Sequence, residues 1–176
     1  MREHQDNNDE FGMGIVFTGR IPLEWHTSSD KLSAKALSDN EKCLRIILAL
    51  SEYPTEPSEE LAALERKVDI TLEMVAELLR SNLDISEPVD IHLGAHELAW
   101  RSPLNLPAVG EAIELAIYLH DLYPRPLRLK GKVKASNGES CHVSLEEQSE
   151  EVQQLLEKYI FLHHRRQIHQ QRHSLS

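Results

Sequence analysis

The chain contains 176 residues, which suits one ordinary domain with room for an appendage. Apolar residues make up 40% of it and charged residues 27%, as in soluble globular proteins. The formal net charge of −10 argues against a nucleic-acid polymer as partner, because non-specific binding of nucleic acids relies on cations that displace phosphate counterions. No apolar run approaches the length of a bilayer span, so no membrane insertion is expected.

The N-terminal segment and the cysteines both indicate a cytoplasmic protein. Residues 1–14 are polar and acidic and lack the apolar stretch of a signal peptide. Cys43 and Cys141 are far apart, and neither belongs to a Cys-x-x-Cys pair or a Cys/His cluster. Two reduced thiols are therefore expected, although a disulfide between them stays open from the sequence alone.

The first predicted element is a strand. Apolar residues occupy odd positions from Ile15 to Trp25, and a period of two is typical of a strand with one buried face. Pro22 lacks the backbone N–H that a central strand uses. At least the later part of this strand is therefore expected at an edge or an end of the sheet.

Residues 28–82 follow with helical periodicity and form a predicted insertion. The segment Ser38-Asp39-Asn40-Glu41 has the spacing of a capping box, which predicts that a helix begins there. Pro54 and Pro57 should end this helix. Its predicted buried face comprises Leu44, Ile47, Leu48 and Ser51.

A second, longer helix is predicted from Pro57 to Arg80, with one apolar stripe on a charged surface. The stripe comprises Leu61, Leu64, Val68, Leu72, Val75 and Leu79. Its spacings of three and four residues resemble an eleven-residue repeat more than a strict heptad. Something must cover such a stripe. Packing on the same domain is one interpretation, and self-association in a helical bundle is favoured because a charged helix between strands resembles an arm.

The strand pattern returns from Val89 to Leu145. Short alternating segments are separated by turns, and Asn137-Gly138 is a strong hairpin signal because both residues tolerate positive φ. This spacing predicts a small antiparallel barrel or a strongly bent sheet. The predicted strands cover residues 89–93, 98–100, 113–119, 127–133 and 141–145.

The last predicted element is a helix that begins near Ser149. Beyond Leu162 the sequence is polar and rich in His and Arg, so residues 163–176 are expected to form a solvated tail with a frayed end. The predicted apolar face of the helix comprises Val152, Leu155, Leu156, Tyr159 and Ile160.

The order of these segments resembles the PilZ domain, a six-stranded barrel closed by a C-terminal helix. The resemblance covers Val89–Ile160 and rests on L-N-L-P-A-V-G-E-A-I-E-L-A-I-Y-L, P-L-R-L-K-G-K-V-K-A-S and S-E-E-V-Q-Q-L-L-E-K-Y-I. It implies an α+β fold: a small antiparallel barrel domain over residues 15–162, with the helical insertion at 28–82 after the first strand. The chain is similar to an atypical subgroup that self-associates through such an insertion and lacks the usual ligand motifs.

PilZ domains are typically bacterial receptors for cyclic di-GMP, and the usual ligand motifs are degenerate here. The family binds the dinucleotide through an Arg-x-x-x-Arg segment before the barrel and an Asp/Asn-x-Ser-x-x-Gly segment on it. No two arginines of this chain are four residues apart. In the second segment His92 replaces the Asp or Asn, Gly94 replaces the Ser, and Glu97 replaces the Gly.

The missing arginines should weaken binding substantially. Each lost charge-assisted hydrogen bond costs on the order of 1.5–3 kcal/mol, so two of them cost roughly two to four decades of affinity. Glu97 also adds a negative charge where a dianionic ligand would lie. Binding in the usual mode is not expected, and no cofactor is expected. A cyclic di-GMP receptor with a non-standard site is the alternative.

The one cationic row of the sequence lies on a predicted strand and comprises Arg128, Lys130, Lys132 and Lys134. The favoured interpretation is a solvated sheet face with partners such as Glu114 on the neighbouring strand. A docking face for an acidic protein or an anionic ligand is the other interpretation.

No catalytic or metal site is predicted. The C-terminal histidines lie among arginines without a carboxylate, and no nucleophile motif or phosphate-binding loop is present. The sequence therefore predicts a non-catalytic, degenerate PilZ-type adaptor that forms a homo-oligomer, with a tetramer as one candidate. It would dock an unidentified protein partner in bacterial second-messenger signalling, and the resemblance suggests motility or type IV pili as the process.

Overall fold

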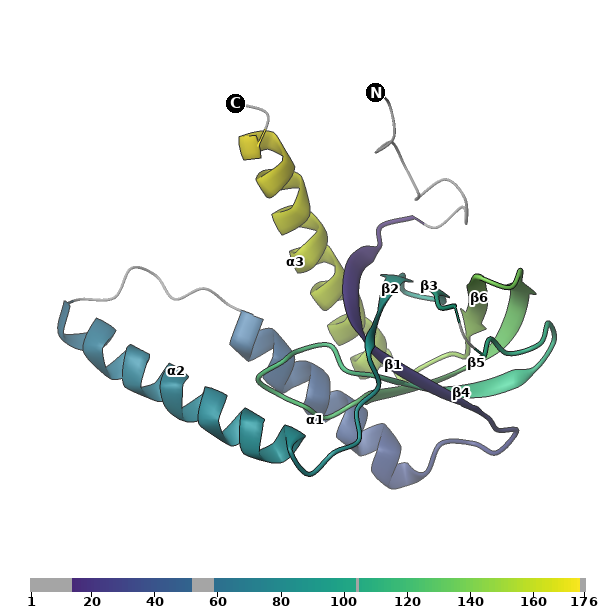
Figure 1. The fold of residues 1–176 in the computed structure, drawn as a ribbon, viewed down its shortest axis with the longest axis horizontal. Helices are drawn as coiled ribbons and strands as arrows, with labels where there is room; N and C mark the ends of the chain where they lie inside the picture. The colour runs from purple at the N-terminus through teal and green to yellow at the C-terminus, as the bar shows by residue number, and fades with distance from the viewer. Residues whose placement is uncertain (1–13, 52–58, 104, 175–176) are drawn as a thin grey trace.

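Six antiparallel strands close into a barrel, and three helices lie outside it (Figure 1). The computed structural model describes residues 14–51, 59–103 and 105–174, and all statements below concern these residues. The strand order around the barrel is β1-β2-β3-β6-β5-β4. The elements are β1 Phe17–Thr27, α1 Ala34–Ser51, α2 Glu59–Arg80, β2 Pro88–Leu93, β3 Glu97–Arg101, β4 Ala112–Ile117, β5 Leu127–Ser136, β6 Ser140–Leu145 and α3 Glu150–Ser174. The predicted barrel with an inserted helical arm and a C-terminal helix is confirmed.

Strand β1 closes the barrel by changing partners midway. Residues 17–22 pair with β2, and residues 23–27 pair with β4. Pro22 lies opposite Pro88 where the first ladder ends, so its missing N–H leaves no gap in a continuous ladder. The end of a ladder is one of the two positions predicted for Pro22, and residues 23–27 beyond it are paired in the sheet with β4 alone. The strand also begins later than predicted, since Ile15 precedes it and is 54% exposed.

Alternate strand residues fill the barrel interior, as the period of two predicts. Close strand packing makes one glycine necessary: a Cβ at Gly131 would overlap the Val143 side chain and the Ser144 carbonyl. The largest fully buried side chains on the strands are Ile91, Leu93, Leu98, Trp100, Ile113, Leu115, Ile117, Leu127 and Leu129.

Helix α1 packs on β5 and on α3, with the predicted face buried. It begins at Ala34, one turn before the predicted capping box, because Ser33 caps it: the Ser33 Oγ accepts a hydrogen bond from the Ala36 N–H at 3.1 Å. The prediction that the helix begins at Ser38 is wrong. Further along α1, Asn40 is buried, and its amide donates to the Arg128 carbonyl at 2.6 Å and accepts from the Arg128 N–H at 2.8 Å.

The hairpin between β5 and β6 is confirmed, but its turn differs from the expected one. Only Gly138 has a positive φ there, at 87°. The Asn137 side chain acts instead as an acceptor, and its Oδ1 takes a hydrogen bond from the Ser140 N–H at 2.9 Å. The asparagine thus fixes the turn through its side chain rather than through a left-handed backbone.

Helix α3 runs along the barrel and continues beyond it to Ser174 (Figure 1). His163 packs edge-on against Phe17 at 5.3 Å and lies 4.3 Å from the Tyr159 ring. One turn later, Arg166 donates a hydrogen bond to the Ser51 carbonyl at the end of α1. The expectation of a solvated tail from residue 163 is therefore wrong for this part of the helix, because its polar side chains pack on α1 and β1.

The remaining predictions of the fold concern the cysteines and the linker between α1 and α2. Both Cys43 and Cys141 are free and buried. The predicted breaks at Pro54 and Pro57 lie outside the described residues, and α2 is observed from Glu59.

Candidate functional site

Helix α2 lies outside α1, away from the barrel (Figure 1). It makes few close backbone contacts with the other helices and strands of the described chain, although its Ala76 is buried. Near its C-terminal end, Leu79 lines a cavity together with Cys43 and Ile46 of α1. The helix is therefore attached to the domain at one end and leaves most of its surface exposed.

The predicted apolar stripe, here called the first row, is largely uncovered by the described residues. It comprises Leu61, Leu64, Val68, Leu72, Val75 and Leu79. Leu64 is 57% exposed, Val68 49% and Val75 48%, whereas Leu72 is half-buried. Packing of this stripe on its own domain, one of the two interpretations of the sequence, is limited to its C-terminal end, where Leu79 and α1 line the same cavity.

The apolar surface of α2 is wider than the sequence analysis predicted. Ile70, Met74 and Leu78, here called the second row, are 50%, 66% and 66% exposed. They were missed because the surface opposite the first row was assigned as uniformly charged. Their i, i+4, i+8 spacing is the signal that could have revealed them.

The degenerate ligand segment lies at the turn between β2 and β3. His92 is in β2, Gly94 lies in the turn, and Glu97 begins β3. The Glu97 carboxylate is bound by other side chains of the barrel: Lys134 Nζ lies 2.9 Å from its Oε1, and His142 Nε2 lies 3.2 Å from its Oε2. The hydrogen bond from Lys134 is the main cause that lowers the pKa of Glu97.

This arrangement brings together three strands. It connects the degenerate ligand segment with the cationic row. Glu97 is on β3, His142 on β6 and Lys134 on β5. Lys134 lies at a β-bulge, where the ladder passes from Val133 to Ala135. Lys134 therefore offsets the negative charge of Glu97 within the same domain and already has a carboxylate partner.

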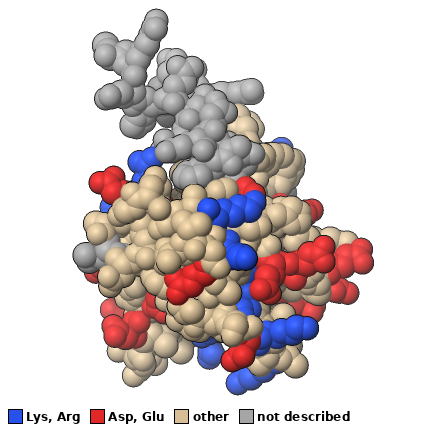
Figure 2. Space-filling model, turned by 90° about the vertical axis from the view of Figure 1, so that its right-hand side faces the viewer, with Lys and Arg blue, Asp and Glu red and all other residues tan. Residues whose placement is uncertain are grey.

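The cationic row on β5 is not a uniform basic face. Arg128 pairs with Glu114 at 3.0 Å, as one interpretation of the sequence predicted. Lys130 is 3% exposed and donates a hydrogen bond to the Asp30 carbonyl, whereas Lys132 is exposed. On the face drawn in Figure 2, basic groups form a band with acidic groups beside it.

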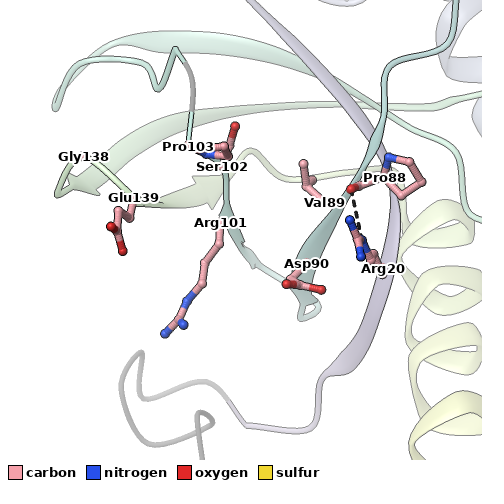
Figure 3. Close-up of a pocket in the computed structure, with 9 residues that line it drawn as sticks. All are labelled: Arg20, Pro88, Val89, Asp90, Arg101, Ser102, Pro103, Gly138 and Glu139. Atoms are coloured by element: carbon pink, nitrogen blue, oxygen red, sulfur yellow. Dashed lines mark hydrogen bonds between the residues drawn. The ribbon is translucent and has the colours of Figure 1, made fainter.

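A third site consists of two arginines on the outer surface of the barrel. Arg20 on β1 lies opposite Asp90 on β2, and Asp90 lies opposite Arg101 on β3. These residues line an open cavity of about 470 Å³, with Asp90 between the two guanidinium groups (Figure 3). Arg20 Nε donates to the Pro88 carbonyl at 3.3 Å. Sequence reasoning missed this pair because only the strand register brings the two arginines together.

Neither a metal site nor a membrane-spanning helix is found among the described residues. In the described ranges, no group of three or more His, Cys, Asp or Glu residues could hold a metal ion. None of the helices described here is long and apolar enough to cross a membrane.

The barrel, its outer helices and the residues above define a PilZ-type domain with an added helical arm. The model of the atypical PilZ domain family, described as a cyclic di-GMP receptor, matches residues 48–173. The match covers most of the chain, so this protein belongs to the atypical PilZ domain family.

A solved structure has the same fold. It is a pathogenic protein from Xanthomonas campestris, described as a new tetrameric PilZ domain that self-assembles through an unusual helical bundle. The two share 22% sequence identity with a TM-score of 0.68, over 88% of this chain and 90% of that one. No curated protein matches this chain.

Proposed function

We propose that this protein is a non-catalytic signalling adaptor that self-associates through the first row of α2 and presents its barrel to a protein partner. The exposed first row carries this proposal. An apolar stripe of this length on a charged helix is typical of an interaction surface, because water contact with apolar side chains is unfavourable. A second copy supplies the same stripe, and the Xanthomonas relative is described as assembling through a helical bundle.

A single charge in the first row should separate the copies. Val68 is the best position, since it is central and exposed, whereas Leu72 is half-buried and its replacement could disturb packing. In Val68→Glu we expect a monomer by light scattering, with unchanged circular dichroism.

The matched control is Val109→Glu, which adds the same charge at a 62% exposed valine in the loop before β4. This variant should keep the mass of the wild type. A Val68→Glu variant that also keeps that mass would contradict self-association through the first row.

The proposed partner is a protein with an acidic segment that contacts the exposed Lys132 side of β5. This side of β5 carries a positive charge, whereas the protein as a whole has a net charge of −10. The contrast supports an acidic segment as the partner of this side. Motility and type IV pili are the processes that the family resemblance suggests. A glutamate-rich peptide should bind the wild type weakly at low salt, and Lys132→Glu should abolish this binding in fluorescence anisotropy. Equal binding by both proteins would contradict docking at β5.

A cyclic di-GMP receptor with a non-standard site is the second candidate. The cavity between Arg20 and Arg101 favours it, because two guanidinium groups can bind the phosphates or guanine edges of a dinucleotide. Calorimetric titration with cyclic di-GMP tests it. Micromolar binding that Arg101→Ala abolishes would make the protein a receptor at this cavity. Absence of heat at high protein concentration would leave the adaptor function.

A further inference from the structure

We propose that a cavity between α1 and the loop before β5 binds a small phosphate monoester with a flat apolar body, of the kind that a nucleoside monophosphate presents. The cavity has a volume of about 670 Å³, within the usual range of small-molecule sites. It shares no lining residue with the cavity between Arg20 and Arg101. Such a site would bind its ligand whether or not the copies of the protein associate.

The cavity is cationic although the protein as a whole is acidic. Of the described residues that line it, four are basic and one, Asp39, is acidic. Arg128 is paired with Glu114 at 3.0 Å, whereas the other three cations form no ion pair with a described residue. The basic residues are Lys35 and Lys42 of α1, Arg125 of the loop and Arg128 of β5.

The charge balance indicates the chemistry of the ligand. When Asp39 and Glu114 are set against the four cations, two positive charges remain at the cavity. A phosphate monoester carries about 1.5 to 2 negative charges at pH 7 and presents three strong acceptor oxygens to lysine and arginine donors. A single carboxylate carries one charge and would leave the other positive charge without a counter-charge.

The remaining walls of the cavity suit an apolar body. Tyr123 contributes an aromatic ring, on which a flat group can stack. The pKa of Tyr123 is raised mainly by burial, and the charges of Arg125 and Asp39 act on it in opposite directions. These charges therefore lie near the phenol, so one ligand can contact both the ring and the cations. The aliphatic lining comprises Ile46, Leu79 and Pro126.

Two contacts hold the walls of the cavity in place without a ligand. The Asn40 amide binds both backbone groups of Arg128, and the Cys43 Sγ donates to the Arg125 carbonyl at 3.7 Å. Asn40 is 1% exposed and Cys43 is 2% exposed. These contacts join α1 to β5 and to the loop, so binding would not require the cations to be brought together first. A preformed site of this kind lowers the cost of binding.

Calorimetric titration of the full chain at low salt with adenosine 5′-monophosphate tests the proposal. The nucleotide should bind at least about tenfold more tightly than inorganic phosphate, which lacks the apolar body, and than adenosine, which lacks the charge. Arg125→Gln and Lys42→Gln should each weaken its binding by about tenfold or more, since each removes one charge-assisted hydrogen bond.

The matched control is Arg45→Gln, which removes a cation from the same helix. Arg45 pairs with Glu41 at 2.9 Å and does not line the cavity, so this variant should bind the nucleotide within about twofold of the wild type. Lys42 and Arg125 are exposed, so their variants should keep the circular dichroism of the wild type.

Four results would overturn the proposal. The first is absence of binding by both the nucleotide and inorganic phosphate at high protein concentration. The second is nucleotide binding that Arg125→Gln and Lys42→Gln leave unchanged, or that Arg101→Ala abolishes instead. The third is adenosine that binds as tightly as the nucleotide, and the fourth is inorganic phosphate that does so. None of these results would change the mass of the assembly, so the proposed self-association would stand.

Discussion

The barrel with α1 and α3, called the body here, buries most of its apolar side chains, whereas helix α2 exposes most of them. In the body, the strands satisfy one another around a closed ring, and α1 and α3 cover its core. In α2, a comparable density of leucine and valine remains in contact with solvent. The core of the body is complete within one copy of the chain, whereas the apolar surface of α2 remains available for contact with another molecule.

The largest expected effect is that of a substitution that creates a cavity in the body. Trp100 is 2% exposed inside the barrel. We expect Trp100→Ala to lower the free energy of unfolding by about 3–5 kcal/mol, from lost burial and an unfilled cavity. Urea denaturation followed by circular dichroism measures this loss, and Trp100→Phe should lose clearly less. The protein that remains folded should keep the wild-type mass, and dissociation of folded Trp100→Ala would show that arm and body are not separable.

A smaller effect is expected where α1 joins the barrel. Asn40→Ala removes both hydrogen bonds to the Arg128 backbone in a buried position. We expect a loss of about 1–3 kcal/mol in the free energy of unfolding, because polar groups at the joint are left without partners. The neighbouring Asp39 is exposed, so Asp39→Ala should change stability by no more than about 0.5 kcal/mol. Equal losses in the two variants would argue against the specific joint.

The smallest expected effect is a pH dependence that belongs to the body alone. The pKa of His163 is lowered to about 4, mainly by burial and to a smaller extent by the nearby charges of Arg166 and His120. The unfolded chain therefore binds more protons than the folded one between pH 4 and the ordinary histidine pKa of about 6.5. Stability is unaffected above this window and falls as pH falls through it, by less than about 1 kcal/mol between pH 7 and pH 6.

Denaturation at pH 7 and pH 6 measures this contribution. His163→Phe should remove it, since the ring packs among aromatic groups and its Nε2 has no hydrogen-bond partner among the described residues. His96→Gln, at an exposed turn position, should retain the wild-type dependence. An unchanged pH dependence in His163→Phe would show that another group is responsible.

Local pattern was sufficient to predict the strands of the barrel, since alternation over a few residues determines both strand and buried face. It was insufficient wherever two local signals competed. Ser33 and Ser38 can both cap α1, and the structure uses the earlier one, since the extra turn contains good helix formers and no break. Pro22 allows either an edge or an end of the sheet, and the strand register, which places it opposite Pro88 at the end of a ladder, decides between them.

The candidate sites depended on information that the sequence does not contain. Glu97 and Lys134 meet across an intervening strand, and Arg20 and Arg101 meet across β2, so the strand order was needed to find either pair. The first row was predictable because helical spacing is local. The second row was equally local, but one apolar stripe was taken to imply that the rest of the helix is charged.

The separation of α2 from the barrel has a consequence for the strength of binding. Because α2 covers little of the surface of the body, an assembly joined through several copies of α2 would leave the outer surface of each barrel accessible. An assembly of this kind is multivalent, and a partner that carries repeated or clustered contact sites would meet the second barrel at a high effective concentration. Weak recognition by one barrel can then give tight and reversible capture by the particle, and any signal that changes the number of copies would change the apparent affinity without altering a single contact.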